Sequence, residues 1–160
     1  MSLNPLVSCA RLLGLMFIAS AGACNNPAQP PSPELVALNA AEARWQSARS
    51  ASNSYSMQQQ VSCFCPTGGT TFEVFVTNGV VSRARSVQTG ADVQSALLTM
   101  FRTIDALFAE VRNALRVAGT LRSVVYDESA GFPTTVSLDP IRAAVDDEVI
   151  YLTRRVTLMP

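Results

Sequence analysis

The sequence predicts an α+β fold, with an antiparallel β-sheet of about six strands and one long helix packed on a face, in the order α-β-β-β-α-β-β-β. An unbroken apolar stripe at helical spacing runs from residue 104 to residue 115. An Asn-Gly dipeptide joins two β-rich runs before the stripe, and three further β-rich runs follow it. With 160 residues, 48% of them apolar, the chain is long enough for one modest hydrophobic core.

The N-terminus has the pattern of a secretory signal. Arg11 is the only charged residue before Glu34, and the apolar run after it is far shorter than the ~20 residues of a membrane-spanning helix. Small residues then lead to Cys24, as in the bacterial lipobox, whose cysteine is acylated and becomes the new N-terminus; Ala21 stands where that motif usually has leucine. We expect residues 1–23 to be a signal peptide and Cys24 to be lipidated. The alternative is an A-x-A site at residues 21–23 for ordinary signal peptidase, which gives a soluble secreted protein.

Residues 24–33 are expected to be the lipidated cysteine and a proline-rich tether. Four prolines lie among polar residues here, and such a segment extends by ~3.1 Å per residue. Residues 34–160 are expected to form a single α+β domain held at the cell envelope. Because Asn25 rather than aspartate follows Cys24, we expect the outer membrane, with the domain facing the periplasm.

The first element of the domain is a helix predicted over residues 34–50. Ser32 is placed to cap the helix N-terminus, and Pro33 suits the first helical position. Apolar residues then recur at helical spacing, and Trp45 among them is expected to anchor the helix on the sheet.

Three strands are predicted next. Residues 55–65 alternate weakly between apolar and polar side chains and end at Pro66. Residues 72–77 and 80–87 are predicted to form a hairpin around Asn78-Gly79. A two-residue turn places Arg83 and Arg85 on the apolar side of this hairpin. Either a β-bulge shifts the register or that side is partly solvated.

The remaining elements are two helices and three strands. Asp92 is expected to cap a short helix that runs to Phe101, and Thr103 to cap the long helix, which Gly119 terminates. The stripe of the long helix consists of Ile104, Leu107, Phe108, Val111 and Leu115. Strands are predicted at 121–126, 134–139 and 148–158, and in the last of them the residues expected to share a face are Ile150, Leu152, Val156 and Leu158.

Charge and composition exclude several classes of function. The chain has 12 basic and 12 acidic residues, so its net charge is zero and it lacks the basic surface of a nucleic-acid-binding protein. It contains no histidine, which removes Ser-His-Asp triads, Cys-His pairs and histidine metal ligands. The sequence therefore indicates no catalytic residue, no cofactor and no nucleic-acid partner.

Cys63 and Cys65 are the two cysteines of the predicted domain, and in an exported protein they are expected to form a disulfide. In a flat strand the Cα atoms of residues i and i+2 lie about 7 Å apart, at the limit of a disulfide's span. The bridge therefore needs a kinked backbone, which Pro66 and Gly68 are placed to give. A structural bridge, a redox-active pair and two free thiols all remain open. Zinc is disfavoured, because two thiolates fill half of a tetrahedral shell.

Tyr126 and Phe132 are the candidate binding residues, since a pocket beside them and Cys63 would suit a ligand. The competing expectation is that Phe132 only closes one end of the core. A group of carboxylates could form a calcium site, since calcium prefers oxygen ligands, but without a glycine at EF-hand spacing the default expectation is that they lie in solvated loops. These carboxylates are Asp127, Glu128, Asp139, Asp146, Asp147 and Glu148.

Several strings of residues together resemble a bacterial family, the domain of unknown function number 6174. They include Ser62-Cys63-Phe64-Cys65-Pro66 and the segments 54–56, 78–81, 103–108, 125–127, 131–134 and 146–148. The resemblance covers about residues 40–158. It implies a single small domain, commonly on a predicted lipoprotein, and it supplies no catalytic residue because the family has no assigned activity.

Three functions follow as hypotheses. The first is a non-enzymatic periplasmic domain, tethered to the membrane through Cys24, that binds a protein or a cell-envelope component. The second is a thiol-disulfide redox protein that uses Cys63 and Cys65. The third is a small exported inhibitor of an enzyme.

Overall fold

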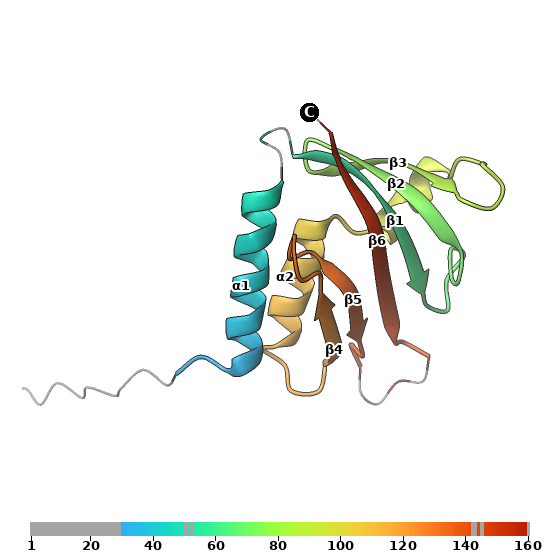
Figure 1. Ribbon diagram of the computed structural model, residues 1–160. Helices are drawn as coiled ribbons and strands as arrows, with labels where there is room; N and C mark the ends of the chain where they lie inside the picture. Colours follow the sequence, from blue (N-terminus) through green and yellow to red (C-terminus); the bar gives the residue numbers. More distant parts are fainter. Residues whose placement is uncertain (1–29, 50, 52, 142–143, 145, 160) are drawn as a thin grey trace, which may run out of the picture. The chain divides into compact units, whose positions relative to one another are not determined.

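The folded part of the chain, Pro31–Pro160, is built around a six-stranded antiparallel sheet in the order β3-β2-β1-β6-β5-β4 (Figure 1). The structure is a computed structural model that describes residues 30–49, 51, 53–141, 144 and 146–159. The elements are α1 (Pro33–Ala48), β1 (Ser54–Ser62), β2 (Thr71–Thr77), β3 (Val80–Ser86), the 3₁₀ helix η1 (Ser95–Met100), α2 (Ile104–Ala114), β4 (Leu121–Tyr126), β5 (Pro133–Leu138) and β6 (Val149–Met159). The α+β class is confirmed. The predicted signal peptide, Cys24 and the start of the tether lie outside the described residues.

The helices differ from the prediction in number and length. The sheet is not covered by one long helix, because α1 has 16 residues and α2 only 11. The order α-β-β-β-α-β-β-β also differs from the structure, because it omits the expected short helix before α2, which is present as η1. Its N-cap is Gln94, while Asp92 forms an ion pair with Arg83 instead of capping a helix. This segment of six residues is a connector between β3 and α2, a common place for 3₁₀ structure.

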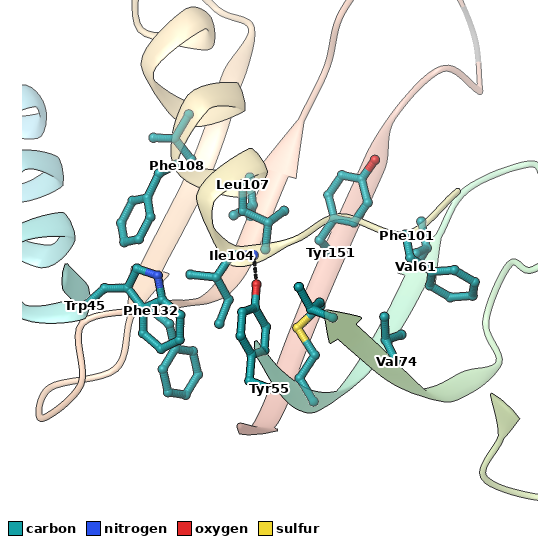
Figure 2. Close-up of a cluster of buried hydrophobic side chains, with 14 of the residues drawn as sticks. Trp45, Tyr55, Val61, Val74, Phe101, Ile104, Leu107, Phe108, Phe132 and Tyr151 are labelled. Carbon is teal, nitrogen blue, oxygen red and sulfur yellow. Dashed lines mark hydrogen bonds between the residues drawn. The ribbon is translucent and has the colours of Figure 1, made fainter. Parts of the chain in front are cut away.

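The core lies between the two α-helices and one face of the sheet. Alternate residues of a strand point to the same face, so β1 contributes Tyr55, Met57 and Val61 to this layer. Trp45 of α1 packs edge-on against Tyr55 with ring centroids 5.4 Å apart, which confirms its predicted anchoring role. Four residues of the predicted stripe are confirmed as buried within α2, and Figure 2 shows Ile104, Leu107 and Phe108 in one cluster. The predicted end at Gly119 is wrong, because α2 ends at Ala114 and leaves Leu115 at its C-cap.

Two hydrogen-bonding side chains inside the core fix the start of α2. The backbone N–H of Ile104 donates to the Tyr55 hydroxyl at 2.8 Å (Figure 2). The amide of Gln59 bonds both backbone groups of Arg102: its Oε1 accepts from the N–H at 2.9 Å, and its Nε2 donates to the carbonyl at 3.0 Å. Residues 102–104 are therefore held on β1, and the position of Arg102 is set from inside the molecule.

Bulges decide which residues of the hairpin and of β6 face the core. In the hairpin, a shift between Phe75 and Val76 pairs Val74 with Ala84 and turns Arg83 and Arg85 away from the core. Of the two alternatives the bulge is confirmed. In β6 the predicted shared face is wrong, because Arg155 has a positive φ of 51° and the register shifts beside it. The strand residues buried in the core are Tyr151 and Thr153, while Ile150 and Leu152 lie on the opposite face and Val156 packs against the core.

Candidate functional site

A tight loop follows β1, and residues 63–69 are called the Phe64 loop here. The predicted strand ends at Ser62 rather than at residue 65, because the backbone bends at once after it. The Sγ atoms of Cys63 and Cys65 lie within bonding distance, and their Cα atoms are 5.3 Å apart, well inside the span of a disulfide. The bend that a C-x-C bridge requires is thus present.

The Phe64 loop is fixed by several backbone constraints. The N–H of Cys65 donates to the Cys63 carbonyl, the N–H of Gly68 to the Cys65 carbonyl, and the N–H of Gly69 to the Val61 carbonyl, each at 2.9 Å. A side chain at Gly68 would place its Cβ 2.5 Å from the Cys63 carbonyl oxygen, so the loop closes this tightly only around glycine. The side chain of Phe64 is nevertheless 94% exposed.

The surroundings of Phe64 are acidic. A shallow concavity of about 280 Å³ lies between Phe64 and the start of β6. Asp146, Glu148 and Ile150 contribute to its walls, and both carboxylate residues are exposed. An exposed aromatic ring therefore stands beside two negative charges at this end of the sheet.

A groove of about 450 Å³ lies on the other side of the sheet, where α2 crosses the paired ends of β5 and β6. We call it the α2–β6 groove. Its apolar wall consists of Ala114, Val117, Leu138, Pro140 and Val149, and its polar edge contains Arg102, Glu110 and Tyr151. Successive residues of β6 alternate in direction, so Val149 and Tyr151 line this groove while Ile150 points toward Phe64.

The polar edge of the α2–β6 groove is rigidly arranged. Arg102 forms an ion pair with Glu110 through Nε and donates from Nη1 to the Thr99 carbonyl at 2.6 Å. Its guanidinium lies over the ring of Tyr151, 5.5 Å from the centroid. Burial raises the pKa of Tyr151, and Glu110 raises it further, so the phenol stays protonated at neutral pH.

The family comparison covers both features. A model of the family of unknown function DUF6174 matches residues 37–158, a span that includes the Phe64 loop and every residue of the α2–β6 groove. The chain belongs to this family. The comparison with curated proteins finds no match, and neither does the comparison with solved structures.

The two predicted binding residues of this DUF6174 domain lie elsewhere. Phe132 is 9% exposed and packs edge-on against Trp45, with centroids 6.3 Å apart. Tyr126 stacks on Phe108 at 6.1 Å, and burial raises its pKa to about 12. Both flank the turn that joins β4 to β5. Cys63 instead follows β1, whose last residue, Ser62, pairs with Ile150 near the start of β6. The structure therefore does not bring Tyr126 and Phe132 together with Cys63.

Three of the six carboxylates of the calcium hypothesis have separate hydrogen-bond or ion-pair partners in the DUF6174 domain. Asp127 accepts hydrogen bonds from the N–H groups of Ala130 and Ser129, which lower its pKa, Asp139 pairs with Arg122, and one oxygen of Asp147 accepts from Ile141 N–H. Within the part of the chain that the structure describes, no three such residues come together as metal ligands. No helix among the described residues is long and apolar enough to span a membrane.

Sequence reasoning missed the residues that distinguish both surfaces. Phe64 was missed because residues 55–65 are predicted as one strand, whereas β1 ends at Ser62 and leaves Phe64 on a loop. The sequence gives no signal for Arg102 and Tyr151. Their arrangement at the edge of the groove depends on contacts with residues distant in the chain, Gln59 and Glu110.

Proposed function

We propose that the protein is a non-enzymatic interaction domain, exported and tethered to the outer membrane through a lipid on Cys24, that binds a protein partner in the periplasm. The single observation that carries this proposal is the nearly complete exposure of Phe64 on a loop built to hold it in place.

The energetics favour recognition through Phe64. Burial of a large apolar side chain gives ~1.5–3 kcal/mol, so a partner that covers the ring of Phe64 gains this free energy on binding. The loop is already ordered by its hydrogen bonds and by the close sulfur atoms of Cys63 and Cys65, which lowers the entropy lost on binding. Buried aromatic residues of this kind supply a large share of the energy at protein interfaces.

The charges beside Phe64 define the complementary surface. Asp146 and Glu148 carry negative charge next to the ring and are exposed. Like charges facing each other across an interface cost several kcal/mol, so an acidic partner is excluded. The partner that fits is a protein with an apolar socket edged by arginine or lysine. An enzyme with such a socket beside its active site would be inhibited, which is the form that the inhibitor hypothesis takes here.

Site-specific photocrosslinking in the periplasm tests the proposal. A benzoyl-phenylalanine at position 64 is expected to give a discrete covalent adduct with one partner protein. The matched control is the same photoreactive residue at Val36, which is 52% exposed on α1, and it should give no such adduct. Reversing the charges with Asp146→Lys and Glu148→Lys should abolish the adduct. If position 64 gives no adduct, or only adducts that position 36 also gives, the proposal is wrong.

The second candidate function is thiol-disulfide exchange, and the half-exposed position of both cysteines on the loop favours it. In the reduced form, the thiols of Cys63 and Cys65 would donate two electrons to a substrate disulfide, which leaves as two thiols while Cys63 and Cys65 form a disulfide; dithiothreitol in the assay then reduces this disulfide again. Insulin reduction that is lost in the Cys63→Ser, Cys65→Ser double variant would support this function. A reduction potential below about −300 mV would mark the bridge as structural and remove it.

A further inference from the structure

We propose that the α2–β6 groove binds a second ligand, an uncharged apolar peptide in extended conformation. The inference does not depend on Phe64, which lies on the loop after β1 and does not line this groove. It rests on the size of the groove, on an unpartnered hydroxyl at its edge and on the fixed donors and acceptors beside that hydroxyl.

The dimensions and the wall of the groove suit a small ligand. Its volume of about 450 Å³ lies within the range of ligand pockets, roughly 300–1,000 Å³. Leu138 and Val149 line it at the paired ends of β5 and β6, and Val117 also lines it, with 59% of its surface exposed. Apolar side chains of a ligand would cover all three residues.

Tyr151 gives the strongest indication of a ligand. Only 4% of its surface is exposed, and its hydroxyl makes no hydrogen bond with any described residue. Figure 2 shows this hydroxyl directed away from the core, in contrast to the Tyr55 hydroxyl, which is bonded to Ile104. The hydroxyl oxygen itself is accessible to solvent, unlike that of Tyr126, so a molecule bound in the groove can reach it and form a hydrogen bond.

Arg102 and Glu110 provide further hydrogen-bonding groups at the same edge. The ion pair and the Thr99 carbonyl occupy Nε and Nη1 of Arg102, while Nη2 has no partner among the described residues. Glu110 uses only Oε1, so its second oxygen can accept a hydrogen bond. Because Gln59 fixes the backbone of Arg102 from the core, these groups are already in place before a ligand arrives.

The balance of charge selects a peptide over other ligands. Arg102 and Glu110 neutralise each other, so a strongly charged ligand would gain from one and lose to the other. An acyl chain has no groups for the polar edge, and the hydroxyls of a sugar would lose their hydrogen bonds against the apolar wall. An extended peptide alternates N–H and C=O groups along one edge and sends every second side chain to one side, which matches a polar edge beside an apolar wall.

An NMR titration with a peptide tests the inference. It is carried out on the domain without the tether and, for comparison, on the full-length protein. The probe is an acetylated, amidated peptide of alternating leucine and alanine. Saturable shifts of the amide signals of Val117, Leu138 and Tyr151 are expected. A capped peptide of alternating lysine and alanine, and dodecyl maltoside as an acyl-chain probe, should bind at least tenfold more weakly. Equal or tighter binding of dodecyl maltoside would overturn the peptide assignment in favour of a lipid.

Variants separate this site from the proposed Phe64 contact. Tyr151→Phe keeps the ring over which Arg102 lies and removes only the hydroxyl, so it should weaken peptide binding three- to tenfold. Val117→Asp places a charge at the exposed mouth and should abolish binding, whereas Val36→Asp on α1 and Phe64→Ser should leave it unchanged. Wild-type affinity in both Tyr151→Phe and Val117→Asp, or no shift with the leucine-alanine peptide, would refute the inference while leaving the Phe64 proposal untouched.

Discussion

Gln59 illustrates how one polar residue organises this molecule. Its side chain is completely buried in β1, where a hydrophobic residue would be expected, yet both ends of its amide are bonded to the backbone of Arg102. An amide is well suited to this position because it mimics a peptide group and pairs with one in both directions. The residue thereby links the centre of the sheet to the edge of the α2–β6 groove.

Replacing Gln59 by leucine should lower the free energy of unfolding by about 1–3 kcal/mol, because two backbone groups of Arg102 lose their partners. Urea denaturation followed by circular dichroism measures the loss. The control is Gln58→Leu on the opposite face of the same strand, which should change stability by less than about 0.5 kcal/mol. Equal effects of the two variants would show that the buried amide is not a stabilising link.

Tyr55 and Tyr126 predict a loss of stability at high pH. Burial raises the pKa of each from 10.0 to about 12. Between pH 10 and about 12 the unfolded chain has released these protons while the folded chain keeps them, so the native state binds more protons and stability falls as pH rises. Urea midpoints measured across this range should decline, and less steeply in Tyr126→Phe, whose lost hydroxyl has no partner among the described residues. A constant midpoint would contradict the assignment.

At the scale of elements, the turn between β4 and β5 approaches α1 closely. Gly131 has a φ of 82°, and a Cβ there would overlap the backbone carbonyl of Ala41. Phe132 follows directly and packs on Trp45, so the glycine lets the turn bring an aromatic residue against the helix. The interface between α1 and the turn between β4 and β5 depends on this absence of a side chain.

Gly131→Ala should therefore cost about 2–4 kcal/mol, from backbone strain and from the overlap with Ala41. Gly90→Ala is a matched control, because Gly90 has a φ of 72° but nothing within 4 Å of the added Cβ. It should cost only about 1 kcal/mol. If thermal or urea unfolding gives the same loss for both variants, the close approach contributes nothing.

The stripe of α2 predicts a second loss at this scale. Phe108 is 1% exposed at the centre of the helix, so Phe108→Ala should cost about 3–5 kcal/mol through lost burial and a cavity. Phe64→Ala changes the same residue type at an exposed position and should cost less than about 0.5 kcal/mol. A loss below 1 kcal/mol for Phe108→Ala in urea would mean that the stripe is not part of the core.

The elements whose signals are local could be predicted from the sequence. The bounds of β4, the Ser32 cap, the Asn78-Gly79 hairpin and the Thr103 cap all depend on neighbouring residues. Which residues of β6 face the core could not be predicted. The register shift beside Arg155 exchanges the faces of the strand, and it arises from the pairing of β6 with β1. The α2–β6 groove was likewise beyond local patterns, since its walls come from three elements far apart in the chain.

On the scale of the whole molecule, the two proposed contact surfaces lie on opposite faces at one end of the sheet. Ile150 is directed to the Phe64 loop, and its neighbours Val149 and Tyr151 are directed to the α2–β6 groove. The domain therefore suits a role in which a protein and a peptide are bound together.

The proposed anchor belongs to this scale as well, and Cys24→Ser tests it. The variant should move the protein from the membrane fraction to the soluble periplasmic fraction, because two acyl chains supply the energy that holds such a domain at a bilayer. Cell fractionation and labelling with palmitate measure both parts. If wild-type protein takes up no palmitate, cleavage by ordinary signal peptidase is correct instead.

The position of β6 has a consequence for how the chain acquires its structure. β1 and β6, the first and last strands of the folded part, pair at the middle of the sheet and join the β2–β3 half to the β4–β5 half. Contacts between such distant segments slow folding, since a long loop must close before they form. The two halves can gather early around their hairpins, but neither can complete its layer until the final strand is available. We therefore expect a chain still lacking this strand to remain unfolded, which is the state in which a secretion channel accepts its cargo.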